Sequence, residues 1–139
     1  MTSDAELTAA LGRYEAAMAA LRQGDPDPYI RCWARADDVT LYGAWGPVDK
    51  GWEPICETLR WVARRFSGGT DEVELTVVKS SGDLAYSVGF ERDNVSVDRG
   101  PVHEMILRVT QVYQRVGGTW QVVHRHADVL PDDQRKSVP

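Results

Sequence analysis

A change in the spacing of hydrophobic residues divides this 139-residue chain and limits the folds open to it. Up to Phe66, hydrophobic residues recur every three or four positions, the period of a helix buried on one face. From Val73 onward, hydrophobic and polar residues alternate, which is the period of a strand buried on one face. Helices followed by strands predict an α+β domain in which the helices pack on a curved, mostly antiparallel sheet.

The first half predicts three helices. The first ends at Gly24 and carries one hydrophobic stripe, formed by Leu7, Leu11, Tyr14, Met18 and Leu21. A short second helix begins at Asp25-Pro26, and a third runs from Trp52 to about Phe66. Between them we expect a short strand at residues 39–42 and a loop from Gly43 to Gly51.

The second half predicts four strands, around residues 73–77, 84–91, 103–115 and 120–129. Turns at 80–83, at 98–101 and at Gly117-Gly118 connect them. We see no internal repeat or domain boundary, so we expect one domain over residues 1–130 and a polar tail over 131–139.

The Gly117-Gly118 turn gives a testable register, with Gln111 opposite His124 and Val109 opposite His126. The face expected to meet the helices then holds Tyr86, Val88, Phe90, Val109, Gln111, Tyr113, Trp120, Val122, His124 and His126. The opposite face would carry a Glu91–Arg108 pair. Polar side chains on an apolar face predict either a hydrated pocket or an internal hydrogen-bond network. A bulge in either strand would reverse this assignment.

His124 and His126 project to the same face about 7 Å apart, because they are two residues apart on one strand. They could be a general base and its partner, since histidine titrates near neutral pH. They could equally be structural groups satisfied by hydrogen bonds. Two histidines without a clear third ligand make a poor metal site, so we expect no bound metal.

Composition excludes several functions. The formal net charge of −5 argues against nucleic-acid binding, and no apolar run is long enough to span a membrane. No glycine-rich loop leads from a strand into a helix, so we expect no nucleotide, flavin or other cofactor. Two cysteines and no visible signal peptide suggest a reducing, cytoplasmic location.

Several segments resemble the NTF2-like superfamily, in particular its SnoaL-like and DUF4440 groups. They are "RYEAAMAALRQGD", "ADDVTLYG", "GWEPICETLRW" and the closing "GGTWQVVHRHAD". The resemblance covers roughly residues 5–128 and implies a cone-shaped pocket between three helices and a concave sheet. It also implies a homodimer formed through the sheet. Relatives include ketosteroid isomerase, polyketide cyclases, limonene epoxide hydrolase, scytalone dehydratase and non-catalytic binding or assembly domains, so fold does not decide function.

Only some of the functional residues of these relatives have a counterpart in this chain. Tyr14 matches the tyrosine that binds the enolate in ketosteroid isomerase, but the position of that enzyme's general-base aspartate falls near Gly43. Asp128 stands near the late acid–base aspartate of SnoaL-type cyclases. The pocket arginines of the calmodulin-dependent kinase II association domain align near Val88, Gln111 and Ala127, none of which is basic.

These observations predict a domain that binds a small apolar organic molecule. If it is an enzyme, we expect cofactor-free acid–base chemistry of the isomerase, cyclase, dehydratase or epoxide-hydrolase type. The candidate catalytic residues are His124, His126, Asp128 and Tyr14, and the candidate pocket residues are Tyr42, Trp45, Trp52, Tyr86, Val88, Phe90 and Gln111. The alternative is a non-catalytic ligand-binding or oligomer-assembly module. Trp61, on the arginine-rich side of the third helix, is expected at an interface or a pocket rim.

Overall fold

Helices and strands follow the predicted order in the computed structural model, which describes residues 3–131. The helices are α1 (Ser3–Arg22), α2 (Asp27–Cys32) and α3 (Trp52–Arg65). The strands are β1 (Thr40–Tyr42), β2 (Val48–Lys50), β3 (Phe66–Ser81), β4 (Leu84–Val97), β5 (His103–Val116) and β6 (Thr119–Val129). The α+β prediction is confirmed, whereas residues 132–139 of the predicted tail lie outside the described residues.

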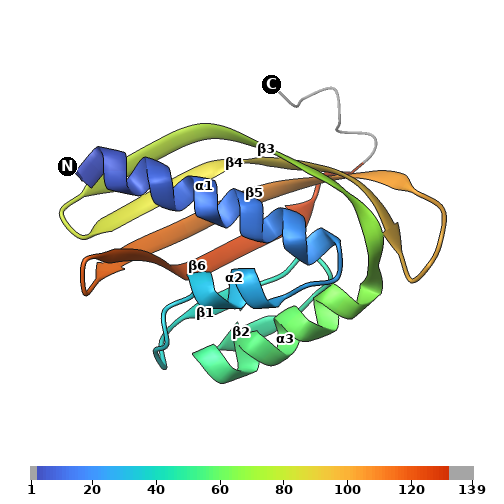
Figure 1. Cartoon of the computed structure of the whole chain (residues 1–139), viewed down its shortest axis with the longest axis horizontal. Helices are drawn as coiled ribbons and strands as arrows, with labels where there is room; N and C mark the ends of the chain where they lie inside the picture. Colours follow the sequence, from blue (N-terminus) through green and yellow to red (C-terminus); the bar gives the residue numbers. More distant parts are fainter. Residues whose placement is uncertain (1–2, 132–139) are drawn as a thin grey trace.

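The strands of the described chain form one sheet in the order β2-β1-β6-β5-β4-β3. β1 pairs parallel to β6, and the other neighbouring strands are antiparallel. Figure 1 shows α1 running along the long strands, with α2 and α3 toward the β1–β2 end. We call the helix-covered face of the sheet the inner face and the opposite face the outer face. None of the helices in residues 3–131 has the length and hydrophobicity needed to cross a membrane.

The first helix forms for the reason the sequence indicated. Leu7, Tyr14, Met18 and Leu21 of its stripe are buried against the sheet, and Leu11 is half-buried. Gly24 adopts a φ of +93°, and its N–H donates to the Leu21 carbonyl at the helix end. Glycine suits this position because other residues rarely adopt a positive φ.

The residues around α3 differ from the prediction at both ends. The expected loop before the helix contains β2, which pairs with β1 through Leu41 and Asp49. This strand was not predicted because it is too short to show an alternation of hydrophobic and polar residues. The expected stop at Gly68-Gly69 lies inside β3, where the β3–β4 register shifts. A Cβ at Gly69 would lie 2.3 Å from the Asn94 carbonyl oxygen, so only glycine allows β4 this close.

The β5–β6 hairpin forms at Gly117-Gly118 as predicted, with Val116 opposite Thr119 and Tyr113 opposite Val122. Beyond Tyr113 a β-bulge places one extra residue, Val123, in β6. His124 therefore lies opposite Val112, and His126 lies opposite Thr110. The predicted pairings of His124 with Gln111 and of His126 with Val109 are wrong, because one inserted residue moves every later side chain to the other face.

The register of β4 against β5 also differs from the prediction by one residue. Glu91 lies opposite Leu107, and Phe90 lies opposite Arg108, so the predicted Glu91–Arg108 pair does not form. Along β4 the buried residues are Ala85, Ser87, Gly89, Glu91, Asp93 and Val95. Tyr86, Val88 and Phe90 alternate with them and lie on the outer face, contrary to the prediction.

Candidate ligand-binding cavity

A cavity of about 60 Å³ lies between the inner face and the helices, with room for a few water molecules. Its walls come from α1, α2, α3, β1 and the loop after it, the start of β3, and the inner faces of β5 and β6. The lining side chains are mostly apolar, and they include Met18, Leu21, Leu41, Trp45, Leu59, Val62, Phe66, Met105, Leu107 and Ala127. The polar side chains of the lining are Arg22, Tyr29, Thr58 and Arg125.

Trp45 lies on the wall formed by the loop after β1, as the sequence predicted for a pocket residue. Its ring packs 5.1 Å from Phe66, measured between centroids, and the Arg65 guanidinium lies 4.1 Å from its centroid. Trp61 meets the same ring edge-on at 6.1 Å and remains 38% exposed. Three aromatic rings and a cation therefore hold this loop against α3.

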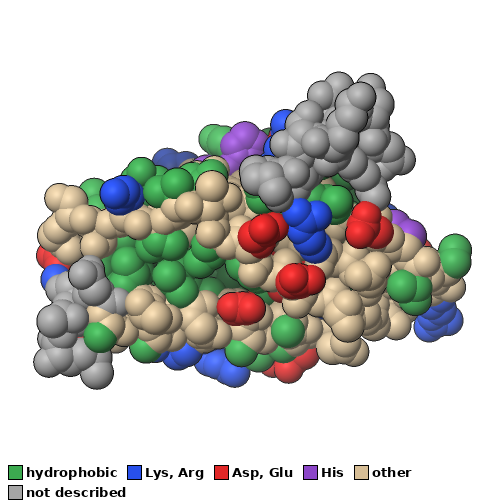
Figure 2. Space-filling view, turned by 90° about the horizontal axis from the view of Figure 1, so that it is seen from above, with side chains coloured by type: hydrophobic (Ala, Val, Ile, Leu, Met, Phe, Trp, Pro, Cys, Tyr) green, Lys and Arg blue, Asp and Glu red, His purple; other side chains and the backbone are tan. Residues whose placement is uncertain are grey.

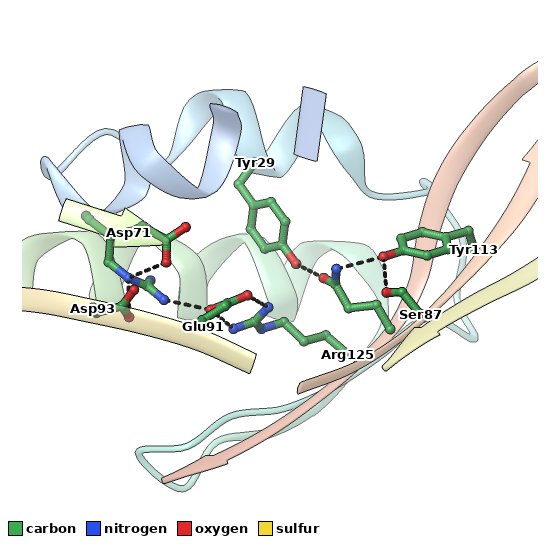
Figure 3. Close-up of polar contacts among 9 residues, drawn as sticks. Tyr29, Asp71, Ser87, Glu91, Asp93, Tyr113 and Arg125 are labelled. Atoms are coloured by element: carbon green, nitrogen blue, oxygen red, sulfur yellow. Dashed lines mark hydrogen bonds and ion pairs between the residues drawn. The ribbon is translucent and has the colours of Figure 1, made fainter. Parts of the chain in front are cut away.

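The two arginines of the cavity belong to a buried chain of ion pairs (Figure 3). Arg125 donates two hydrogen bonds to Glu91, of 2.8 and 2.9 Å. Arg22 donates to Glu91 and to Asp93, each at 2.9 Å. Burial alone would raise the pKa of Glu91, but Arg125 and Arg22 outweigh it and lower that pKa. Glu91 is thus a carboxylate fixed between two cations.

A second chain of hydrogen bonds continues along the inner face. The Tyr29 hydroxyl donates to Gln111 Oε1 at 2.5 Å, and Gln111 Nε2 donates to the Tyr113 hydroxyl at 3.0 Å. The hydroxyls of Tyr113 and Ser87 lie 2.6 Å apart. Burial raises the pKa of Tyr29 and of Tyr113, so both stay neutral. The prediction that Gln111 lies on the helix-covered face is correct, and its polar atoms are paired there.

A separate hollow opens between α1 and β3, where Figure 2 shows hydrophobic side chains gathered beside acidic ones. Leu11, Met18, Val73 and Leu75 contribute its apolar lining. Met18 and Tyr29 line both this hollow and the cavity, so these two side chains form the partition between them.

The two histidines lie on the outer face, not in the cavity. His124 Nδ1 is 2.7 Å from Thr40 Oγ1, and burial followed by the neighbouring His126 lowers the pKa of His124. Tyr42 packs edge-on against both imidazoles, at 5.5 Å from each. The two imidazole centroids are 6.5 Å apart, close to the predicted spacing.

The other candidate residues lie in different places. Asp128 forms two 2.7 Å hydrogen bonds with Arg108 on the exposed side, and they lower the pKa of Asp128. Tyr14 is buried, but its hydroxyl donates to the Trp120 carbonyl at 2.6 Å instead of pointing into the cavity. Trp52 is half-buried under the Arg35 guanidinium and is not part of the cavity wall. The structure therefore places His124, His126 and Asp128 on the outer face and Tyr14 on the inner side, so none of the proposed catalytic residues lines the cavity.

Sequence reasoning missed the arginines and carboxylates of the inner face. One signal was present for Arg22, which lies four residues after Met18 and so continues the helix stripe. Glu91 and Asp93 share a strand face with Ser87 and Gly89, a pattern typical of an exposed face. Only the β4–β5 and β5–β6 registers show that this face is covered.

Comparison with known proteins agrees with this architecture. An NTF2-like superfamily protein from Salmonella enterica matches 91% of this chain and 90% of its own, with 19% identity and a TM-score of 0.77. A ketosteroid isomerase-like protein from Erwinia carotovora matches 91% and 95%, with 20% identity and a TM-score of 0.77. An NTF2-like protein of unknown function from Pseudomonas putida matches 100% and 96%, with 24% identity and a TM-score of 0.70.

These likenesses define the class of fold, which is NTF2-like. The family model for the SnoaL-like domain matches residues 12–131. The chain therefore belongs to the SnoaL-like domain family of the NTF2-like superfamily, as the sequence resemblance predicted. No curated protein matches it.

Proposed function

We propose that this chain is a ligand-binding domain whose cavity takes a small, mainly apolar organic molecule that carries a hydrogen-bond acceptor. The observation that carries the proposal is the pair of buried arginines, Arg22 and Arg125, in the lining of an otherwise apolar cavity. Apolar walls with a few convergent polar groups are typical of small-molecule sites. Guanidinium groups only donate hydrogen bonds, so the ligand supplies a carbonyl, carboxylate or similar oxygen.

Binding is better supported than acid–base catalysis. Among the described residues that line the cavity there is no histidine and no carboxylate, the usual general bases. Glu91, the carboxylate that both arginines contact, is a weak base because its pKa is lowered. His124 and His126 would serve a reaction only on the outer face. The catalytic hypothesis for them fails if His124→Ala and His126→Ala leave the turnover of an identified substrate unchanged.

The test compares two neighbouring positions of β6. Native mass spectrometry of the untreated protein reveals any retained molecule, and a panel of small ketones, amides and carboxylates screened by thermal shift supplies probes. Ala127→Leu adds three carbon atoms that project into the cavity, whereas His126→Leu places the same leucine side chain at the neighbouring position on the outer face. We expect Ala127→Leu to weaken binding at least tenfold and His126→Leu to leave it unchanged. Equal binding by both variants, or no binding by any probe, would contradict the proposal.

We also propose that two copies associate through the outer face of the sheet. The support is a group of apolar side chains there that remain about 40% exposed, formed by Tyr42, Val77, Tyr86 and Val88. Apolar patches rimmed by polar groups commonly mark interaction surfaces. Native mass spectrometry of the same sample reports the mass of the assembly.

A further inference from the structure

Three acidic side chains meet under α1 at the β3–β4 ladder. Asp71, Glu91 and Asp93 each place a carboxylate oxygen within 4.8 Å of the others. Their side chains are 0%, 5% and 0% exposed, and Asp71 lies directly opposite Asp93 in the register. Like charges directly opposite one another destabilise a sheet, and burial makes the repulsion worse.

The charges around this cluster do not balance if all three carboxyl groups are ionised. The cations that face it are Arg22 from α1 and Arg125 from β6. Of the other side chains around the cluster, Tyr29 from α2 is neutral, and Met105 and Leu107 from β5 are apolar. Glu15 from α1 lines the same hollow as Glu91, but it is exposed and brings no positive charge. Three carboxylates against two guanidiniums leave one buried negative charge, which a single bound cation would neutralise.

Unpaired oxygen atoms show where that cation belongs. Among the described residues, neither oxygen of Asp71 has a hydrogen-bond partner, and neither does Asp93 Oδ1. Arg22 is already committed to Asp93 and Glu91, and its Nε lies 3.9 Å from Asp71 Oδ1, which is too far for a hydrogen bond. A proton placed between Asp71 and Asp93 would make the missing hydrogen bond and balance the charge.

We propose that Asp71 and Asp93 form a proton-binding site that holds one shared proton at neutral pH. Burial, the hydrogen bond that a protonated Asp71 can make with Asp93, and the nearby Glu91 raise the pKa of Asp71 to about 9, which agrees with the geometry. A metal ion fits less well, because Arg22 already occupies the space against these carboxylates with its positive charge.

The site affects the cavity because Arg22 belongs to both. Loss of the proton adds a negative charge beside Arg22 and so reduces the positive potential that this guanidinium presents to a ligand. An anionic or acceptor ligand would then bind less tightly in alkaline solution. This consequence depends on the proposed ligand-binding function, whereas the proton site does not.

The direct test is carboxyl-carbon NMR of the full chain labelled with ¹³C-aspartate, followed from pH 5 to pH 10. We expect one aspartate carboxyl signal to titrate near pH 9, and we expect this titration to be missing from the spectra of Asp71→Asn. Titration of every aspartate below about pH 6 would overturn the proposal. This measurement on the unmodified protein needs no ligand and does not depend on the folding of the variant.

Urea unfolding between pH 5 and pH 8 provides a second test. The folded protein keeps the Asp71 proton in this range, whereas the unfolded chain, with a pKa of 3.8, has lost it. The unfolding constant should therefore rise about tenfold per pH unit relative to Asp71→Asn. Asp128→Asn, which removes a carboxylate paired on the outer face, should parallel the unmodified protein. If the unfolding constants of Asp71→Asn and of the unmodified protein change equally with pH, the proposal is overturned.

A metal ion is tested by adding Mg²⁺, Ca²⁺ or Mn²⁺ separately at pH 7 and recording the melting temperature. We expect no shift that depends on Asp71. If a metal ion raises the melting temperature of the unmodified protein but not of Asp71→Asn, the site binds a metal ion instead of a proton, and the proposal is overturned.

Discussion

Alternate residues of β6 meet two different environments. Arg125 and Ala127 face the helices, where Arg125 is 6% exposed and holds Glu91 with two hydrogen bonds. His124 and His126 face outward, beside Tyr42 and the Arg108–Asp128 pair. The comparison shows that the polarity of a side chain does not decide which face of the sheet it occupies: a permanently charged guanidinium is buried here, whereas two imidazoles lie on the outer face. What decides the difference is the availability of a partner, since a buried charge is tolerated only when it is paired.

The largest effect is expected where a buried partner is removed. Arg125→Ala leaves Glu91 with Arg22 alone and an uncompensated charge in the interior, so we expect a loss of about 3–5 kcal/mol in the free energy of unfolding. Arg108→Ala removes the exposed partner of Asp128, and the free energy of unfolding should hardly change. Urea unfolding at pH 7 measures both. Similar losses of unfolding free energy in the two variants would mean that burial does not make the inner ion pair more important for stability than the outer one.

A smaller difference should separate two tyrosines. Tyr113→Phe deletes the hydroxyl that bonds to Ser87 and Gln111, leaving buried polar atoms without partners. We expect a loss of about 1–3 kcal/mol in the free energy of unfolding. Tyr86→Phe changes a side chain that is 42% exposed on the outer face and should alter stability little. Equal shifts of the urea midpoint in the two variants would show that the hydrogen bonds of the inner face do not add to the stability of the protein.

Association should depend on the outer face alone. Val88→Glu places a charge among the exposed apolar side chains, and we expect the dissociation constant of the proposed dimer to rise at least tenfold. Sedimentation at several protein concentrations measures it, with circular dichroism to confirm the fold. A monomeric unmodified protein, or a dimer unaffected by Val88→Glu, would contradict association through this surface.

The smallest effect is expected from His124 in acid. Its pKa is lowered in the folded state, so the unfolded chain binds the proton more readily. The contribution of His124 to the free energy of unfolding is fully present above pH 6.5, the pKa of the group in the unfolded chain. It decreases as the pH drops below that value. His124→Gln removes this loss, so we expect the variant to be more stable at pH 5 relative to pH 7 than the unmodified protein, as measured by urea unfolding at both pH values. The same change between pH 7 and pH 5 in the variant and in the unmodified protein would show that His124 is not the responsible group.

Much of the fold could be predicted, and the candidate site could not. The stripe on α1 and the Gly117-Gly118 turn follow from local spacing and from the backbone freedom of glycine, and both are confirmed. The cavity residues Arg22 and Arg125 were missed because a charged residue is normally expected at the surface. Of the predicted pocket residues, Trp45 lines the cavity, in keeping with the position of its loop directly after a strand.

The sequence by itself determined the order of helices and strands, the turns between the long strands and the membership of the NTF2-like superfamily. Each of these depends on residues close together in the chain. Only the tertiary structure decided which face of the sheet the helices cover. One bulge at Val123 moves His124 and His126 outward and Arg125 inward, where Arg125 pairs with Glu91, a residue distant in sequence that also pairs with Arg22. A pairing between distant residues leaves no local pattern, so the same residues that form the site were the hardest to assign.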